Sequence, residues 1–231
     1  MTAATGVLVT RPRPEADHTA ARLAGMGFQP VVSPVLTIAA RPLRLREATA
    51  IQAVLVTSGN ALATLPTGLR ATALLAVGAA TAARARAGGF STVHSADRDA
   101  AALAILTTRL CQPEQGPLLL ACGAGQGEAL AQTLRGAGFR VARRVTYAAR
   151  PVRRLDPAGL AALRGDGLRW ALFYSAESAR AFAAAAAGER LTGIRAVAIA
   201  TTVAAALAPL PWADIRVASR PNQDEMLACL T

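Results

Sequence analysis

Six short polar segments stand where apolar, strand-like runs of this sequence end and helix-like stretches begin. Their hydroxyl and amide groups can donate hydrogen bonds, and a helix that starts beside them adds free backbone N–H groups and the positive end of its dipole. One such position suits one anion, whereas six suit a ligand with several carboxylates or phosphates. The same side chains could instead simply cap the helices that follow them. The segments are Thr10-Arg11, Thr57 to Asn60, Gly78 to Thr81, Cys122 to Gly127, Ser175 to Ser178 and Thr201-Thr202.

Tyr147 is the best single candidate for moving a proton. The chain has only one other tyrosine, Tyr174, and Tyr147 lies on a strand-like segment that we expect to join two parts of the fold. A phenol has a reference pKa of about 10, so it acts as a hydrogen-bond donor or proton source and not as a base at neutral pH. A tyrosine that is merely packed in a hinge is the alternative. No pair of carboxylates stands out as a general acid and base.

Other catalytic chemistries find little support in the sequence. The three cysteines are widely separated and form no metal-ligand spacing, and the two histidines have no partner motif, so we expect no metal site. The segment Gly123 to Gly127 lacks the full spacing of a dinucleotide loop, and no acidic residue follows it about twenty positions later. A Walker A motif is also absent.

The chain is strongly basic, with a formal net charge of +11, and all of its basic side chains are arginines. A GC-rich genome would explain the absence of lysine, but the physical consequence is the same. Arginine binds carboxylates and phosphates through two parallel hydrogen bonds, and a positive field attracts anions. The partner is therefore expected to be a nucleic acid, a phosphorylated metabolite or a polycarboxylate. A nucleic acid is disfavoured, because there is no helix-turn-helix, zinc finger or aromatic stacking platform and the arginines are scattered.

Short apolar runs alternate with alanine-rich amphipathic stretches along the 231 residues. This alternation predicts an α/β fold in which helices cover both faces of parallel sheets, as one large domain or two small ones. No signal peptide or bilayer-spanning run is visible, so we expect a soluble, cytoplasmic protein without a membrane partner. The predicted strands are Val7–Thr10, Val31–Val35, Ala53–Thr57, Leu74–Gly78, Ser91–His94, Pro117–Ala121, Arg140–Tyr147, Trp170–Ser175, Ala196–Ala200 and Ile215–Ser219.

An internal repeat organises these elements. Residues Ala21–Pro42 and Gln132–Pro151 both carry the pattern L-x-G-x-G-F, and both end in a strand that closes with AARP. A weaker pair, Ala53–Leu65 and Ala171–Phe182, places a serine between a strand and a helix. We call the first pair of segments A and A′ and the weaker pair B and B′. The chain therefore has the form A–B–A′–B′, which predicts two similar lobes. Either A joins B and A′ joins B′, or A joins B′ and B joins A′; the second pairing is favoured if both AARP strands connect the lobes.

An ordered set of motifs along nearly the whole chain resembles the uroporphyrinogen-III synthase family. Each motif is weak by itself, and their order carries the resemblance. The motifs are VLVTRP at Val7–Pro12, L-x-x-x-G-F at Leu23–Phe28, VLVTSGNAL at Val54–Leu62, VG-x-x-TA at Val77–Ala82, L-x-x-AGF-x-V at Leu134–Val141, VTY at Val145–Tyr147, FYSAESA at Phe173–Ala179 and AIATTVAAAL at Ala198–Leu207.

The resemblance implies a fold of two similar doubly wound parallel-sheet lobes, each flavodoxin-like, joined by a two-stranded β ladder. One lobe is expected to combine residues 1–37 and 150–231, and the other to comprise residues 40–147. This is the pairing of A with B′, and it places both AARP strands in the ladder. The polar strand ends of the two lobes are then expected to line a shared cleft.

The resemblance also implies the reaction. The family cyclises hydroxymethylbilane, a linear tetrapyrrole with eight carboxylates, to uroporphyrinogen III, with ring D inverted, water lost, and no metal or cofactor. We therefore expect a cyclising hydro-lyase of haem, sirohaem and cobalamin biosynthesis, a monomer that contacts hydroxymethylbilane synthase transiently. Tyr147 matches the family's cleft tyrosine, a proton donor to the departing hydroxyl. The expected substrate-binding residues are Arg11, Thr57, Ser58, Asn60, Gly78, Thr81, Gly123, Ser175, Ser178 and Thr202.

The sequence departs from the family pattern at several positions. Gly59 and Ala176 stand where a proline is common, Ala200 replaces a glycine, Val203 falls where a threonine is frequent, and Gln126 occupies a position often held by arginine. These departures leave open a divergent, non-catalytic two-lobed receptor for an anionic metabolite. Such a receptor would bind a small anion tightly without turning it over.

Overall fold

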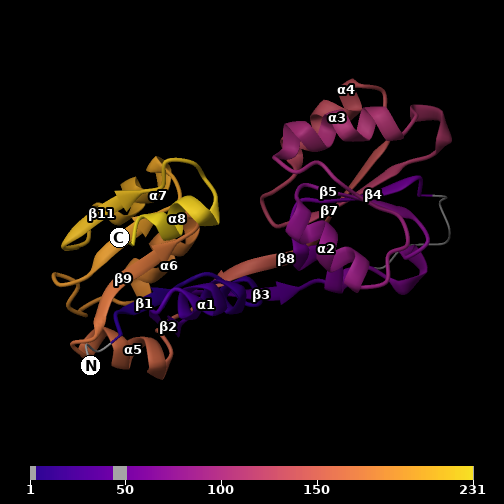
Figure 1. The fold of residues 1–231 in the computed structure, drawn as a ribbon. Coiled ribbons are helices and arrows are strands. Elements are labelled where there is room, and N and C mark those ends of the chain that lie inside the picture. The colour runs from indigo at the N-terminus through magenta and orange to yellow at the C-terminus, as the bar shows by residue number, and fades with distance from the viewer. Residues whose placement is uncertain (1–3, 44–50, 231) are drawn as a thin grey trace. The chain divides into compact units, whose positions relative to one another are not determined.

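The computed structural model describes residues 4–43 and 51–230 of the chain. The chain divides into two compact units, which we call unit 1 (Met1–Thr37 with Arg150–Thr231) and unit 2 (Ile38–Ala149). Each unit has its own sheet, and helices cover the sheet (Figure 1). The predicted mixed α/β class with parallel sheets is confirmed. In the described part of the chain, no helix is both long and apolar enough to cross a membrane.

Unit 1 is built on a five-stranded sheet. Its order is β11-β10-β9-β1-β2, and every neighbouring pair is parallel. The strands are β1 (Gly6–Val9), β2 (Gln29–Val32), β9 (Leu168–Phe173), β10 (Arg195–Ala198) and β11 (Asp214–Val217), and the helices are α1 (Glu15–Gly25), α5 (Pro157–Arg164), α6 (Ala176–Ala185), α7 (Thr201–Leu207) and α8 (Gln223–Ala228).

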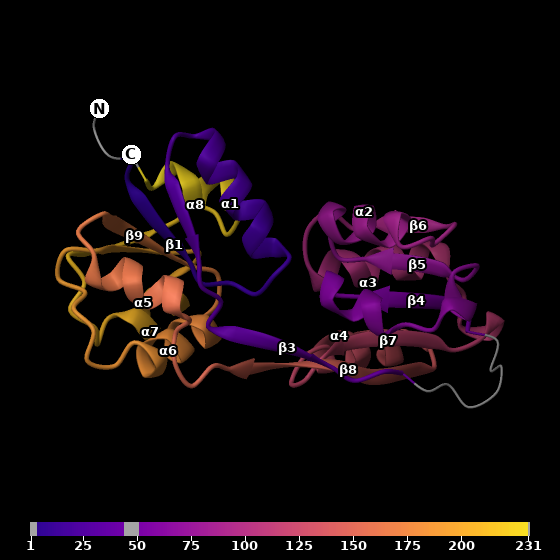
Figure 2. The same ribbon diagram turned by 90° about the horizontal axis from the view of Figure 1, so that it is seen from below.

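Helices cover the sheet of unit 1 on both faces, which explains why β1 is an uninterrupted apolar run. All four residues of β1 are buried, as expected for a parallel strand between two helical layers. Leu23 of α1 and Met226 of α8 belong to the core on one face. On the other face, the ring of Phe182 in α6 packs edge to face on Phe173, with 5.2 Å between the ring centroids. Figure 2 shows α1 and α8 on one side of the sheet and α5, α6 and α7 on the other.

Unit 2 is built on a six-stranded sheet of order β3-β8-β7-β4-β5-β6. The pairs from β8 to β6 are all parallel. The strands are β3 (Leu36–Ala40), β4 (Ala53–Val56), β5 (Ala73–Ala76), β6 (Val93–Ser95), β7 (Leu118–Gly123) and β8 (Val141–Pro151), the α-helices are α2 (Ala79–Ala87), α3 (Ala100–Leu110) and α4 (Glu128–Gly136), and the 3₁₀ helices are η1 (Gly59–Thr64), η2 (Thr67–Leu69) and η3 (Pro113–Gln115).

Alternate residues of β4 serve two cores, one on each face of the sheet of unit 2. Leu55 belongs to the core that contains Leu103 of α3 and residues of α4. Val56 belongs to the core that contains Ala82 of α2 and residues of η1. Figure 1 shows the same division, with α3 and α4 on one side of the strands and α2 on the other.

The chain passes between the units twice, once in β3 and once in β8. The backbone N–H of Val152 donates to the carbonyl of Val35 (3.0 Å), and the N–H of Arg41 donates to the carbonyl of Thr146 (2.7 Å). Between these two bonds the residue numbers rise along β3 and fall along β8, so the two strands are antiparallel. β8 is also the parallel neighbour of β7.

The repeated pattern L-x-G-x-G-F is a helix end that occurs once in each unit. In both copies the N–H of the phenylalanine donates to the carbonyl of the leucine five residues earlier, at 3.0 Å (Phe28 to Leu23, and Phe139 to Leu134). The second glycine of each copy has a left-handed backbone. These are the features of a Schellman motif, in which glycine closes a helix and turns the chain toward the next strand.

Replacing Gly138 by alanine is expected to lower the free energy of unfolding by about 1 kcal/mol, because an L residue is strained in the left-handed region. The φ of Gly138 is +89°. The matched control is Gly136→Ala at the end of α4, where an added Cβ meets no atom within 4 Å. We expect the control to be neutral or to stabilise the protein by up to about 1 kcal/mol. Urea unfolding of both variants checks this, and equal losses would contradict the role of Gly138.

When the repeats are matched, the five strands of unit 1 have the same spatial order as the five strands of unit 2 other than β3. A contributes β1 and β2, B contributes β4 to β6, A′ contributes β7 and β8, and B′ contributes β9 to β11. The order β2-β1-β9-β10-β11 in unit 1 therefore corresponds strand by strand to β8-β7-β4-β5-β6 in unit 2. Each sheet combines one copy of the first half with the other copy of the second half: A with B′, and A′ with B.

Candidate functional site

In unit 2 the expected anchors lie at the carboxyl ends of three neighbouring strands. Thr57 to Asn60 follow β4, Gly78 lies between β5 and α2, and Gly123 ends β7. The segments after β4 and β7 then leave on opposite faces of the sheet, since η1 packs in one core and α4 in the other. Open α/β sheets bind ligands outside strand ends where the connections diverge in this way.

In unit 1 the equivalent pair of strands is β1 and β9. Arg11 follows β1, and Ser175 and Ser178 follow β9. The hydroxyl of Thr10 donates to the carbonyl of Leu172 at 2.6 Å, which ties the two strand ends together. α1 and α6 then leave on opposite faces, so unit 1 repeats the arrangement of unit 2.

Two of the expected anchors also cap helices. The Oγ of Ser58 accepts from the N–H of Asn60 (3.3 Å) at the start of η1, and the Oγ of Ser175 accepts from the N–H of Ser178 (3.0 Å) at the start of α6. The two hydroxyl oxygens of Ser175 and Ser178 lie 2.9 Å apart. Capping uses a lone pair of the hydroxyl and leaves its proton for another acceptor, so a capping serine can also bind a carboxylate.

Helices α2 and α7 start without a side-chain cap from the described residues. α2 begins after Gly78 and α7 after Ala200, and the two helices hold equivalent places in B and B′. In α2 the first N–H with an intrahelical acceptor is that of Ala82. The N–H groups before it, up to that of Thr81, have no such acceptor. In α7 the position of Thr81 is held by Val203, which is buried, and the expected anchor Thr202, one residue earlier, is exposed.

Tyr147 lies buried beside the loop that follows β7. Its side chain is 4% exposed, and its hydroxyl donates to Oε1 of Gln126 at 3.1 Å. The N–H of Ala124 donates to the carbonyl of Tyr147 (2.9 Å), and Gly123 pairs with Tyr147 after a register shift between β7 and β8. A Cβ on Gly123 would lie 2.8 Å from a ring carbon of Tyr147. The ring therefore needs a glycine at this strand end.

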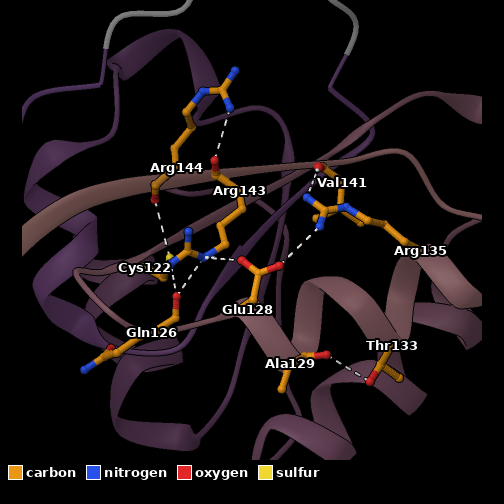
Figure 3. A network of polar contacts seen from close by, with 9 residues as sticks. All are labelled: Cys122, Gln126, Glu128, Ala129, Thr133, Arg135, Val141, Arg143 and Arg144. Atoms are coloured by element: carbon orange, nitrogen blue, oxygen red, sulfur yellow. Dashed lines mark hydrogen bonds and ion pairs between the residues drawn. The ribbon is translucent and has the colours of Figure 1, made fainter.

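The backbone of Gln126 is held at three points, and Figure 3 shows the two at its carbonyl, from Arg143 and Cys122. Its N–H donates to the carbonyl of Gly123 (3.1 Å), and its carbonyl accepts from Nε of Arg143 (2.8 Å) and from Sγ of Cys122 (3.2 Å). Burial raises the pKa of the Cys122 thiol, partly offset by Arg143, so the thiol stays protonated and can donate. Glu128 lies 3.6 Å from Nε of Arg143 and keeps this guanidinium near the loop.

Two threonine hydroxyls, those of Thr57 and Thr146, are buried without a hydrogen-bond partner among the residues that the structure describes. A buried hydroxyl without a partner costs about 1–3 kcal/mol. Such groups in a native protein call for an explanation, and an incoming ligand or water is one. Thr57 is therefore an expected anchor whose buried hydroxyl has no partner among the described residues.

Arg11 stacks on the second tyrosine of the chain. Its guanidinium carbon lies 4.1 Å from the ring centroid of Tyr174, and its Nη1 donates to Oε1 of Gln223 at 3.4 Å. Burial raises the pKa of the Tyr174 phenol, and the Thr19 hydroxyl and Arg11 offset part of that rise. Tyr174 is thus neutral at physiological pH and supports the position of Arg11.

Arg84 is a residue at this site that the sequence analysis missed. Its guanidinium, which comes from α2, lies so close to Gly59 that a Cβ there would be 2.7 Å from Cζ. The glycine at position 59, where the family commonly has a proline, therefore leaves room for the guanidinium of Arg84 beside Ser58 and Asn60. No local pattern reveals this contact, because α2 and the strand end are brought together only by the fold.

Among the hollows that the described residues form, two lie within single units and are lined by none of the expected site residues. One, of about 390 Å³, lies in unit 2 and includes Arg70 and Arg84. The other, of about 370 Å³, lies in unit 1 and includes Arg153, Arg154 and Arg164.

Comparisons with known proteins agree on one family. The model of the family described as uroporphyrinogen-III synthase HemD matches residues 17–228. The crystal structure of uroporphyrinogen-III synthetase from Helicobacter pylori 26695 is similar, with a TM-score of 0.64, 18% sequence identity, and coverage of 98% of this chain and 98% of that chain. This likeness shows a shared fold.

Two structures from Thermus thermophilus are also similar. The first, a mutant uroporphyrinogen III synthase, has a TM-score of 0.49 and 21% identity, covering 98% of this chain and 97% of that one. The second, also a uroporphyrinogen III synthase, has a TM-score of 0.41 and 20% identity, covering 97% of both chains. No curated protein matches the sequence.

Proposed function

The chain belongs to the uroporphyrinogen-III synthase family, and from this premise we propose how its residues carry out the family's reaction. It is an enzyme of tetrapyrrole synthesis whose substrate is hydroxymethylbilane, which it cyclises to uroporphyrinogen III with inversion of ring D and loss of water. The family match over residues 17–228 is the observation that carries this function. Nothing in the match or the fold favours a non-catalytic receptor. By reaction class the enzyme is a cyclising hydro-lyase.

The finer architecture is part of the same proposal. The lobes are residues 1–37 with 150–231, and residues 40–147, and β3 and β8 form the ladder that joins them. The strand order of unit 1, numbered along the chain as 2-1-3-4-5, supports a flavodoxin-like lobe. Matching the repeats gives unit 2 the same order by circular permutation. The monomeric state, the transient contact with hydroxymethylbilane synthase, the cytoplasmic location and the shared cleft stay predictions.

The carboxylate arms of the substrate bind to the polar strand ends. The uncapped starts of α2 and α7 offer N–H donors at equivalent places, and the buried Thr57 hydroxyl lacks a partner among the described residues. Arg11 and Arg84 add guanidinium groups near β1 and β4. The proposed binding residues are Arg11, Thr57, Ser58, Asn60, Gly78, Thr81, Gly123, Ser175, Ser178 and Thr202.

Tyr147 acts as the proton donor. Its proton passes to the hydroxyl on the terminal carbon of ring A, the C–O bond breaks, and the electron pair leaves with the oxygen as water. The resulting azafulvenium carbon is attacked by the substituted carbon of ring D, and the spiro intermediate opens and recloses with ring D inverted. The proton that the final ring closure releases returns to the phenolate. The enzyme mainly contributes orientation, because uncatalysed closure gives the isomer without inversion.

The product isomer tests the proposal. When the protein is incubated with hydroxymethylbilane that hydroxymethylbilane synthase generates, we expect uroporphyrinogen III as the main product. The products are oxidised to the porphyrins, and the type I and type III isomers are separated by chromatography. The same mixture without the protein is the control and is expected to give type I. Formation of type I alone in both mixtures would refute the function.

A further inference from the structure

The hydrogen bond between Tyr147 and Gln126 poses a problem for a proton donor. A phenol has one proton, and in this structure the Tyr147 hydroxyl donates to Oε1 of Gln126 at 3.1 Å. While that bond holds, the proton is directed at the protein and not at a substrate. If Tyr147 protonates the leaving hydroxyl, something must release its proton at the right moment.

The side chain of Gln126 can provide this release because its backbone is fixed, while its amide carries both an acceptor, Oε1, and a donor, Nε2. The backbone is held by Gly123, Arg143 and Cys122 at 3.1, 2.8 and 3.2 Å, so the side chain that reaches the phenol extends from a fixed point. Rotation of the amide about its last bond exchanges the acceptor Oε1 for the donor Nε2. Nε2 would then donate to the phenol oxygen, and the phenol proton would be free to point elsewhere.

We propose that Gln126 is a positioning residue that gates the proton of Tyr147, an inference that rests on the proposed function. With Oε1 toward the phenol, Gln126 holds the proton. With Nε2 toward the phenol, it directs the O–H at the departing hydroxyl and stabilises the phenolate that forms when the proton leaves. The phenolate is protonated again by the proton released at ring closure, so the gate returns to its first state.

Two substitutions separate gating from a structural role. Gln126→Glu keeps the shape and the acceptor but, when ionised, cannot donate, so it holds the phenol proton permanently. Gln126→Leu removes both functions. A structural role predicts that the isosteric glutamate is the milder change. Gating predicts the reverse, with kcat about tenfold lower for Gln126→Glu than for Gln126→Leu.

A double-variant comparison excludes simple repulsion of the anionic substrate by the new carboxylate. In a Tyr147→Phe background there is no phenol proton to gate, so Gln126→Glu is expected to change kcat by less than about twofold. Repulsion or misfolding would lower kcat by the same factor in both backgrounds, and that result would overturn the proposal.

A titration tests the gate without any turnover. A Tyr174→Phe background leaves Tyr147 as the only tyrosine, so the phenolate absorbance reports its titration midpoint, with circular dichroism to confirm the fold. If Gln126 can turn and donate to the phenolate, Gln126→Leu raises the midpoint and Gln126→Glu raises it further. If Gln126 is a fixed acceptor, Gln126→Leu lowers the midpoint, and the proposal is wrong. Should the protein make no type III isomer, the proposed function fails, while the titration still decides whether the amide turns.

Discussion

Replacing Tyr147 by phenylalanine is expected to lower kcat for uroporphyrinogen III formation about 100-fold, the lower end of what a positioned general acid contributes. The ring of Tyr147 is buried among apolar side chains of unit 2, and phenylalanine preserves this packing. The hydroxyl and its bond to Gln126 are lost. KM is expected to change much less than kcat, because the carboxylate arms bind elsewhere.

The isomer ratio gives this experiment a second readout. A slow enzyme leaves more free hydroxymethylbilane to close by itself, so the share of type I isomer is expected to rise in Tyr147→Phe. Tyr174→Phe is the matched control, since it removes the other phenol of the chain and keeps the ring beneath Arg11. Full activity of Tyr147→Phe, with the type III share unchanged, would remove the phenol from the mechanism.

The fold class could be predicted because buried parallel strands leave a clear mark on the sequence. β1 and β4 are runs of four residues that are all buried, and such strands carry no polar alternation. The Schellman ends at Phe28 and Phe139 were visible as repeated motifs because their glycines are required by backbone conformation. The order of the strands in each sheet could not be predicted, since it depends on pairing between strands that are far apart in the chain.

The segment after α1 shows where local patterns stop being informative. The apolar run predicts a strand at Val31–Val35 and the repeat predicts a second one that closes with AARP at Pro42, whereas the structure has β2 (Gln29–Val32) and β3 (Leu36–Ala40). Pro34 lies between them and has no N–H to donate to a sheet. β2 therefore pairs with β1, while β3 pairs with β8, more than 100 residues away in sequence.

The candidate site was predictable as a set of strand ends but not as a set of contacts. Ser58 and Ser175 stand between strand and helix in the sequence, and the structure places them there as helix caps. The contact of Gln126 with Tyr147 depends on the register shift between β7 and β8. The approach of Arg84 to Gly59 depends on how α2 packs. Both are tertiary effects that no spacing in the sequence encodes.

Replacing Gly123 by alanine is expected to lower kcat by about two orders of magnitude, because displacing a reacting group by about 1 Å can cost that much. The added Cβ would lie 2.8 Å from Cζ and 2.9 Å from Cε2 of Tyr147, and 3.0 Å from Oε1 of Gln126. Overpacking of this kind also lowers the free energy of unfolding by about 1–3 kcal/mol. Gly68→Ala is the control, since its Cβ would meet no atom within 4 Å. Urea unfolding and steady-state rates measure both effects.

The double variant Gly123→Ala with Tyr147→Phe separates the two consequences. The steric conflict involves ring carbons that phenylalanine also has, so the loss of stability should persist in full. The additional loss of kcat should not persist, because a displaced phenol and an absent phenol both fail to donate the proton. The double variant is therefore expected to have a kcat within about threefold of that of Tyr147→Phe alone. If the two losses of kcat multiply instead, Gly123 acts on the reaction by a route other than Tyr147, such as direct contact of its backbone with the substrate.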